Sequence, residues 1–529
     1  MKIPTTEQIQ VSLEQFITIN SMGKIIETVV KSFNGGIIND PRTNRENVAK
    51  IITNFDVLTD IYRAIPYRNS ESGDTAPTTS KKQNFCIALR TGTTYSLYAL
   101  GVVSGTARAE ILYKDITTGG SNDLGDSGWA TPTANQSASG TTDFNLFVYY
   151  KKRNLIFGGK ASQYIWAFSP SGSAFSETER DLTSYTNLAQ GLVHSKDDIL
   201  YIPYDNKIAK LDDSTWTNTA LTLPSHLFIR SIWEDGNNLM IACAPLSGVG
   251  ESIIYVWDRD SSLTTLSETI KSGTEKLLIA DKTDGVNISI SLSGSNSTRN
   301  NDRVIFRYLN GNIPIKFAEL VGGSNSTLLP IAKQVINNRL YFMMSITLNG
   351  SVRNGVWSVG RDYVNGGFSI IHERTPNNDT ALSTPILYSF FFVGDYLFQS
   401  YNSSSAFALS KTNDSEAYTD STSIIETKIY NNGDSSYTKE LRTATVMFEP
   451  LPANGQVVLK YKIDAETSFT TLYTYSTDNG ISHGTGNIES SSTNLSQYKE
   501  IQFRIESVGG AVITGFKFKS EIIKDNDNG

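Results

Sequence analysis

The stretch "NNLMIACAPLSGVGESIIYVWD" (residues 237–258) contains the pattern that decides the fold. A polar turn precedes a short apolar run, a variable loop follows, and a second run rich in β-branched and aromatic residues ends at Trp257. Short runs of this kind, bounded by Gly, Asn, Asp or Ser, are typical of antiparallel strands joined by turns. Because almost every apolar run of the chain has this form, the sequence predicts an all-β protein.

The same unit recurs along the chain, with further copies at residues 93–113, 153–168, 197–211, 285–308, 337–359 and 394–409. Equivalent apolar residues in the copies are Leu97, Leu155, Leu200, Leu239, Ile288, Leu340 and Leu397. Their average spacing is about 50 residues, which matches one four-stranded blade of a β-propeller. A single blade cannot bury both faces of its sheet, so several must pack around an axis. We therefore expect a β-propeller of about seven blades over residues 76–420, with six or eight if an end unit is misread.

Beyond residue 420 the strands become longer and alternate strictly. Val457, Leu459, Tyr461 and Ile463 share one parity, which predicts that they face the core, and Ile501, Phe503 and Ile505 alternate in the same way. Strands with one apolar face predict a β-sandwich domain over residues 421–529.

The first 75 residues fit neither pattern. Residues 22–33 are compatible with a helix or a strand, and "RENVAKIITNF" (residues 45–55) predicts a short helix capped by Asn44. Residues 68–84 have the composition of a linker. We expect an extended N-terminal arm over residues 1–75.

The composition of the 529-residue chain excludes several classes of protein. The net charge is −7, the pI is about 5.4, and Lys and Arg are scattered, so a nucleic-acid-binding surface is not expected. Cys86 and Cys243 lie in apolar runs, which favours buried thiols over a disulfide or a metal site. The N-terminus lacks the apolar region of a signal peptide, and no stretch reaches the roughly 18 apolar residues of a membrane span. These features predict a soluble protein made in the cytoplasm.

The sequence predicts no metal, no cofactor and no catalytic residue. The histidines His194, His226, His372 and His483 are far apart and show no paired-ligand spacing. The final "DNDNG" (residues 525–529) begins like a calcium loop but stops before the glutamate that such a loop needs.

A carbohydrate-binding or carbohydrate-degrading propeller is the alternative. Two pairs of turn carboxylates, Asp258 with Asp260 and Asp281 with Asp284, could act on a glycosidic bond if about 5–9 Å apart. The repeated aspartate box of sialidases is missing from all units. Aromatic side chains that could stack on sugars end three equivalent strands, although filling of the core is the favoured role: Trp166, Trp257 and Trp357.

Three short segments near the N-terminus carry a resemblance to a known group. "SFNGGIINDPR" (residues 32–42), "NFDVLTD" (residues 54–60) and "IPYRN" (residues 65–69) resemble the start of tailed-bacteriophage virion proteins in which such segments precede a β-propeller. "TATVMFEPLPANGQVVLKYKID" (residues 443–464) resembles part of the sandwich that closes those proteins.

The resemblance implies a structural protein of the phage tail, located in the virion and made in the host cytoplasm. Such subunits form a homo-oligomeric ring in the tail hub or nozzle, between the portal and adaptor side and the distal tail or fibre proteins, and DNA passes through without sequence-specific binding. An interaction propeller of a bacterial cell is a third hypothesis.

A glycine-rich turn in the first segment is the candidate docking site of the arm, on its own propeller or on the next subunit. Glycines allow a sharp, closely packed turn, Pro41 biases the preceding residue toward an extended conformation, and an arginine can bridge to a neighbour. The predicted interface residues are Gly35, Gly36, Asp40, Arg42, Tyr67 and Arg68.

Overall fold

The computed structural model confirms an all-β protein. It describes residues 16–20, 23–34, 36–37, 48–57, 63–67, 70–71, 80–103, 108–116, 129–132, 144–160, 164–245, 251–260, 265–270, 275–294, 302–310, 313–322, 326–348, 351–361, 367–376, 386–394, 396–403, 406–412, 422–431, 437–477, 485–489 and 497–523. In these ranges no helix is long and apolar enough to span a membrane. The chain divides into two compact units: unit 1 comprises residues 1–69, 361–374 and 415–529, and unit 2 comprises residues 70–360 and 375–414.

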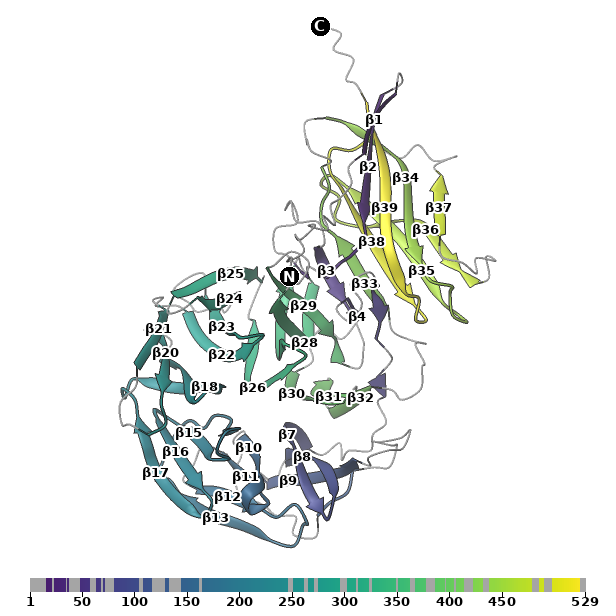
Figure 1. Ribbon diagram of the computed structural model, residues 1–529. Helices are drawn as coiled ribbons and strands as arrows, with labels where there is room; N and C mark the ends of the chain where they lie inside the picture. The colour runs from purple at the N-terminus through teal and green to yellow at the C-terminus, as the bar shows by residue number, and fades with distance from the viewer. Residues whose placement is uncertain are drawn as a thin grey trace, which may run out of the picture. The chain divides into compact units, whose positions relative to one another are not determined.

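Unit 2 consists of small antiparallel sheets that follow one another along the chain (Figure 1). The first sheet contains β7 (Ser80–Thr91), β8 (Thr94–Val103) and β9 (Arg108–Ile116); the second contains β10 (Phe144–Tyr150), β11 (Leu155–Lys160), β12 (Tyr164–Phe168) and β13 (Phe175–Asp181), with the 3-10 turn η1 (Lys151–Arg153) between β10 and β11; and the third contains β14 (Leu192–Val193), β15 (Leu200–Tyr204), β16 (Lys207–Asp212) and β17 (Thr215–Thr222). The fourth sheet contains β18 (Leu227–Asp235), β19 (Asn238–Pro245), β20 (Ser252–Trp257) and β21 (Thr265–Ile270), and the fifth contains β22 (Glu275–Thr283), β23 (Val286–Ser293), β24 (Arg303–Asn310) and β25 (Ile313–Val321). The sixth set contains β26 (Thr327–Ile336), β27 (Arg339–Leu348) and β28 (Ser351–Arg361), and the last sheet contains β30 (Ile386–Val393), β31 (Tyr396–Ser403) and β32 (Ala406–Thr412) with β6 (Ser70–Glu71).

The predicted repeat corresponds to these sheets. Each of the seven anchor residues, from Leu97 in β8 to Leu397 in β31, lies in the second strand of its sheet. Six of the anchors are buried and Leu155 is half-buried. The repeat deduced from the sequence is therefore confirmed as a repeat of small sheets.

Neighbouring sheets contact one another through their first strands. β7 contacts β10, β10 contacts β14, β18 contacts β22, β22 contacts β26 and β26 contacts β30, while β15 links the third sheet to β18. β30 in turn contacts β7, so the last sheet packs on the first. One apolar core joins these two sheets, with Phe85, Leu97 and Leu112 on one side and Val393, Phe398 and Leu409 on the other.

Most first strands contain a β-bulge near their start. The register shifts at Gln83 in β7, Asn145 in β10, Arg230 in β18, Leu278 in β22 and Tyr388 in β30. β26 has a longer irregularity between Leu328 and Lys333. The extra residue of a bulge is unpaired, bends the strand and points its side chain in a new direction. These irregularities therefore decide which side chains depart from the regular alternation of the strand.

Closely packed tryptophans fill the space between sheets. Trp166 is 2% exposed and lies in a core that includes Tyr98, Phe147 and Phe168. Its indole ring covers Gly158 of β11 so closely that a Cβ placed there would lie 2.0 Å from Cζ2. Trp257 and Trp357 are also buried. The preference for core filling over sugar stacking is therefore confirmed for all three.

Gly158→Ala should destabilise unit 2 by about 2 kcal/mol, because the added methyl group forces the packed indole of Trp166 to move. The urea midpoint of unfolding, followed by tryptophan fluorescence, measures the effect. Gly367→Ala, a change in unit 1, is the control for an added methyl group with nothing within 4 Å, and it should leave the unfolding midpoint of unit 2 at the wild-type value. Equal midpoints for the two variants would contradict the packing described.

Unit 1 contains two larger sheets and a short hairpin. One sheet has the order β1 (Phe16–Asn20), β2 (Gly23–Val30), β39 (Ile513–Ile522), β34 (Lys439–Phe448) and β37 (Thr485–Glu489); the other contains β29 (Phe368–Arg374), β3 (Ala49–Thr53), β33 (Ser423–Thr427), β38 (Ile501–Val508), β35 (Gln456–Ile463) and β36 (Thr470–Ser476). β4 (Phe55–Asp56) pairs with β5 (Ile65–Pro66).

Aromatic side chains join the two sheets of unit 1. The ring of Phe503 in β38 lies 4.7 Å from that of Phe516 in β39, measured between centroids, and Phe448 lies 5.3 Å from Tyr475. The predicted inward residues Val457, Leu459, Ile501, Phe503 and Ile505 are buried. Tyr461 is half-buried, so only this member of the inward set departs from the prediction.

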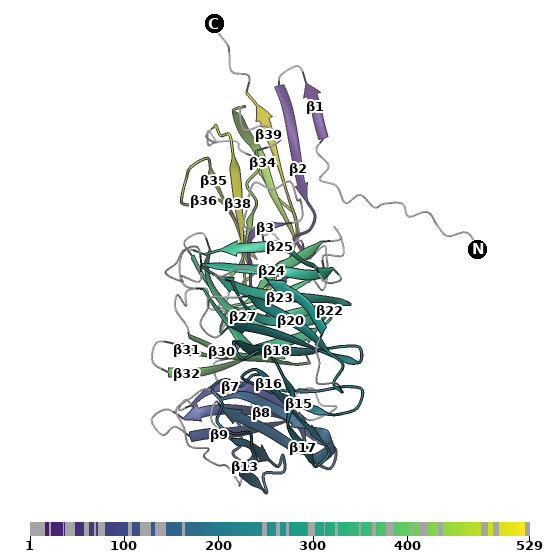
Figure 2. The same ribbon diagram turned by 90° about the vertical axis from the view of Figure 1, so that its left-hand side faces the viewer.

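The N-terminal region differs from the extended arm expected for residues 1–75. β2 runs antiparallel to β39, with Val30 opposite Phe516, and β3 runs antiparallel to β33, with Thr53 opposite Ile424 (Figures 1 and 2). The described parts of residues 16–67 thus complete both sheets of unit 1, whereas β6 belongs to unit 2. The helix predicted at residues 45–55 is wrong, because Ala49–Thr53 is a strand. Ile51 and Ile52 are β-branched, and both are buried by partners that are distant in sequence.

Candidate functional site

A tight turn in unit 1 holds the only predicted interface glycine that lies in the described ranges. Gly36 has φ +78°, and its carbonyl accepts a hydrogen bond from Ala49 N at 3.0 Å. Ile37 N donates to Ile370 O of β29 at 2.7 Å. A Cβ on Gly36 would lie 2.5 Å from that same carbonyl oxygen. The turn therefore requires glycine both for its conformation and for the close approach of two backbones.

Tyr67 lies against the same strand, β29. Its hydroxyl donates to Glu373 Oε2 at 2.6 Å, and the guanidinium of Arg374 lies 4.8 Å from the centre of its ring. Glu373 and Arg374 are 2% and 3% exposed. The Tyr67 amide donates to Asn54 O, which also accepts from Ser423 Oγ. We call Gly36, Tyr67, Ile370, Glu373 and Arg374 the arm joint.

The arm joint brings together two of the six predicted interface residues, Gly36 and Tyr67. Gly35, Asp40, Arg42 and Arg68 lie outside the described residues. Contact of the arm with a neighbouring subunit stays a prediction.

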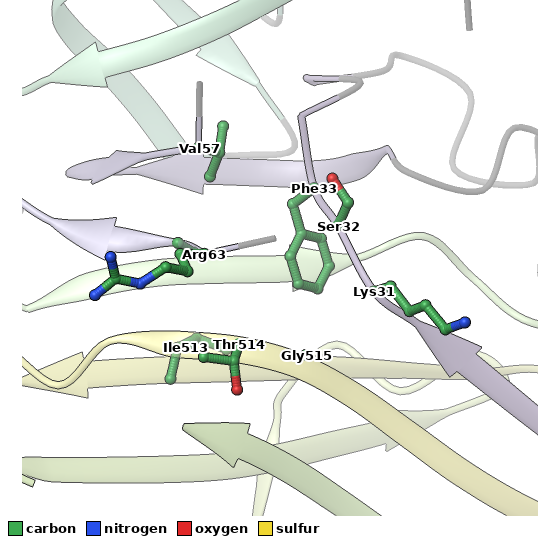
Figure 3. Close-up of a pocket in the computed structure, with 9 residues that line it drawn as sticks. Lys31, Ser32, Phe33, Val57, Arg63, Ile513, Thr514 and Gly515 are labelled. Atoms are coloured by element: carbon green, nitrogen blue, oxygen red, sulfur yellow. The ribbon is translucent and has the colours of Figure 1, made fainter. Parts of the chain in front are cut away.

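A void near the arm joint is too small for an organic ligand. Its volume is about 10 Å³, which is the space of one water molecule. Figure 3 shows the ring of Phe33 above the strand that carries Ile513, Thr514 and Gly515, with Arg63 to one side. Arg63 forms an ion pair with Glu449 at 2.6 Å. This site is a packing defect at a joint between strands.

A pocket of about 490 Å³ in unit 2 is the stronger candidate for a binding site. Residues from or next to the first strands β14, β18, β22 and β26 line it. Small-molecule sites commonly have volumes of about 300–1,000 Å³. The wall carries equal numbers of cations and carboxylates, namely Arg230, Lys282, Lys333, Glu234, Asp281 and Asp284.

Lys333 connects three of the strands around this pocket. Its ammonium donates to Asp281 Oδ2 at 2.7 Å, to Ala280 O at 2.9 Å and to Ile232 O at 3.2 Å. Three acceptors satisfy its three protons, and the side chain is 12% exposed. Lys333 therefore acts as a structural cation that joins β18, β22 and β26.

Two more charged groups in the wall have partners at its edge. Lys282 pairs with Asp235, and that contact keeps the pKa of Asp235 below its usual value against the opposing effect of burial. Glu234 accepts hydrogen bonds from the amide of Ser195 at 2.7 Å and from its hydroxyl. Lys282 is therefore paired with a carboxylate, and both oxygens of Glu234 already accept a hydrogen bond from an uncharged group.

Arg230 is different from the other cations of the wall. It is the bulged residue of β18, and its closest hydrogen-bond acceptor is Asn187 Oδ1, 3.3 Å from Nη1. Nε and Nη2 are buried and have no hydrogen-bond partner among the residues that the structure describes, where Arg230 also has no ion pair. Burial lowers the pKa of Arg230 from its ordinary value, as expected for a cation without a carboxylate beside it.

The turn carboxylates predicted from the sequence divide between two places. Asp281 and Asp284 line the pocket. Asp258 and Asp260 form a turn, with Asp260 N donating to Asp258 Oδ1 at 3.1 Å, and Arg259 between them binds Asp197 and Asn237 O. The pocket residues Arg230, Glu234 and Lys333 were not predicted. Arg230 and Lys333 owe their positions to strand irregularities, and no local sequence motif indicates these irregularities.

The histidines and cysteines offer no metal centre in the described part of the chain. His194 and His372 are buried, His226 is exposed, and His483 and the predicted calcium-like segment lie outside the described residues. Cys86 and Cys243 are free and buried, which confirms the expectation of buried thiols.

The two thiols should not react with a bulky thiol reagent in the native protein, and both should react after denaturation. Burial raises the pKa of Cys86 and of Cys243, so the reactive thiolate is suppressed as well as covered. Titration with an aromatic disulfide reagent at pH 8, with and without denaturant, measures this. Rapid labelling of either thiol in the native state would contradict the packing.

Comparisons with known proteins find remote likenesses of structure only. No protein-family model and no curated protein sequence matches the chain. An exo-β-1,3-galactanase from Phanerochaete chrysosporium is 12% identical, covering 86% of this chain and 100% of its own, with a TM-score of 0.31. The N-terminal part of BBS1, solved with ARL6, is 11% identical over 66% of this chain and 97% of its own, with a TM-score of 0.39. YjhT is 11% identical over 55% of this chain and 97% of its own, with a TM-score of 0.35.

Proposed function

We propose that the chain is a non-catalytic structural protein of a tailed-phage virion, built from a seven-bladed β-propeller and a β-sandwich, and that it forms a ring in the tail. The contacts between neighbouring sheets support the propeller, because they run from β7 through successive first strands, with β15 making the link to β18, to β30 and back to β7. β6, which precedes the first sheet in the chain, supplies the outer strand of the last one by pairing with β32.

Hydrogen bonds between first strands also support a closed arrangement. Gln190 both donates to and accepts from the backbone of Phe147 in β10, and Gln334 does the same with Phe392 in β30. Ser231 of β18 donates to Ala280 O of β22 at 2.9 Å. Together with Lys333, these side chains link sheets whose backbones are not paired.

The arm joint is the observation that carries the structural role. The three segments that resemble phage virion proteins converge there: Gly36 packs on Ile370, Phe55–Asp56 pairs with Ile65–Pro66, and Tyr67 binds Glu373. In its described residues, each segment serves to connect strands. A structural role of these segments is consistent with a protein that acts as a subunit of an assembly.

The carbohydrate-degrading alternative has weaker support. Glycoside hydrolysis needs two carboxyl groups that flank the bond, one of them protonated. Asp258 and Asp260 belong to a turn, and Asp281 is held in an ion pair by Lys333.

Light scattering coupled to size-exclusion chromatography tests the proposal. A ring predicts a single species with a mass that is an integral multiple, well above two, of the 58.2 kDa chain. The same protein should sediment with purified phage particles from the host that encodes it. A monomer that is absent from such particles would refute the proposal.

A further inference from the structure

We propose that the pocket of unit 2 binds a small, hydroxylated carboxylate such as an acidic monosaccharide, with Arg230 holding the carboxylate. This inference is independent of ring formation, since it concerns one chain and one pocket. It rests on a cation that has no counter-ion among the described residues, on the pairing of the other two cations with carboxylates, and on the carboxylates that also line the pocket.

The first step is the position of Arg230. A bulge takes this residue out of the ladder of β18 and β19, so its side chain lies in the wall of the pocket between neighbouring first strands. Ring contact with Phe228, 5.9 Å from the guanidinium, supports the side chain from its own strand. Bulges recur near binding sites because they re-aim single side chains.

The second step is the charge of Arg230. Lys333 and Lys282 have carboxylate partners in Asp281 and Asp235, whereas the hydrogen-bond partner of Arg230 within the described ranges is the amide oxygen of Asn187. A partly buried guanidinium without a counter-ion is unfavourable, and a planar carboxylate matches its geometry. An anion that enters the pocket would supply the missing charge and accept a hydrogen bond from the guanidinium.

The third step separates carboxylates from phosphates. Glu234, Asp281 and Asp284 also line the pocket, and Glu234, whose hydrogen bonds come from the uncharged Ser195, would repel the double charge of a phosphate more strongly than the single charge of a carboxylate. The same carboxylates accept hydrogen bonds from hydroxyl groups. One negative charge next to several hydroxyl groups is the chemistry of a uronic or similar acidic sugar, and the volume of about 490 Å³ accommodates a ring of that size.

Isothermal titration calorimetry of the full-length protein at low ionic strength tests the proposal with three probes: D-glucuronate, D-glucose and inorganic phosphate. We expect D-glucuronate to bind at least about tenfold more tightly than either of the others, and to bind less tightly as salt is added. Equal binding of glucuronate and glucose would overturn the role of the carboxylate. Tighter binding of phosphate would overturn the sugar assignment, and failure of glucuronate to bind would overturn both.

Variants assign the binding to Arg230. Arg230→Gln should lower the affinity for D-glucuronate by about tenfold or more, and Arg230→Lys should lower it less because the charge remains. Arg153→Gln is the matched control, since Arg153 is paired with Glu179 outside the pocket. Thermal unfolding establishes that each variant is folded. Unchanged affinity in Arg230→Gln, or an equal loss in Arg153→Gln, would contradict the assignment.

Discussion

Gly36→Val is expected to destabilise unit 1 by at least about 3 kcal/mol. The φ of +78° is unfavourable for any β-branched residue, and the new Cβ would lie 2.5 Å from Ile370 O and 2.9 Å from Ile370 N. Both contacts are with backbone atoms, so no side-chain rotation relieves them. Chemical denaturation followed by circular dichroism measures the loss, and limited proteolysis should cleave the variant within unit 1.

Gly236→Val separates the two causes of that loss. Gly236 also has a positive φ, +63°, but nothing lies within 4 Å of its added Cβ. Because Gly236 lies in unit 2, the loss is measured on that unit, which should lose only the conformational part, about 1–2 kcal/mol. From the sequence alone, changes in this segment are expected to impair assembly before folding; the contact with Ile370 of the same chain indicates that folding is affected first. Equal stabilities of Gly36→Val and the wild type would contradict this explanation.

Lys333→Met is expected to destabilise unit 2 by about 3 kcal/mol. The change leaves Asp281 and the carbonyls of Ile232 and Ala280 without their shared donor in a largely buried position. Because Lys333 links three sheets, cooperative unfolding of unit 2 should begin at a lower denaturant concentration. The midpoint and slope of the denaturation curve together measure the effect.

A double-mutant cycle attributes the loss to the ion pair. Asp281→Asn combined with Lys333→Met should cost less than the sum of the single changes, because the double variant leaves no unpaired charge. Lys152→Met serves as the control, since its pair with Asp212 is more exposed and should contribute little. Strict additivity of Asp281→Asn and Lys333→Met would show that the pair is not coupled.

The repetitive part of the fold could be predicted from the sequence because its signals are local. Leu97, Leu239 and Leu340 each belong to a short apolar strand between polar turns, and all of them lie in second strands. The alternation of Val457 and Leu459 likewise identified buried faces. The repeat length and the alternation of apolar residues can be seen within a short stretch of sequence, so predicting these strands does not require knowing which distant strands they pair with.

The N-terminal region could not be predicted in the same way. Val30 is paired with Phe516 and Thr53 with Ile424, at sequence separations that local patterns do not encode. β3 has no partner nearby in the chain, and the local pairing of β2 with β1 does not reveal the second partner of β2, which is β39. The glycine turn at Gly36 did carry a local signal, and the observed positive φ explains it.

The residues that line the pocket could be predicted only in part from the sequence. Asp281 and Asp284 were identified because aspartates in turns are conspicuous, whereas Arg230 lies in the middle of "FIRSIW" with no motif around it. Its role follows from a bulge and from the absence of a described carboxylate partner. Both are properties of the folded backbone.

Electron microscopy of tailed phage particles, labelled with a gold-conjugated antibody against this chain, tests the proposed place of the protein in the tail. We expect label on the tail, at one level along its axis, and closed rings in images of the purified protein. Purified protein that stays monomeric, together with particles that carry no label, would contradict the proposal.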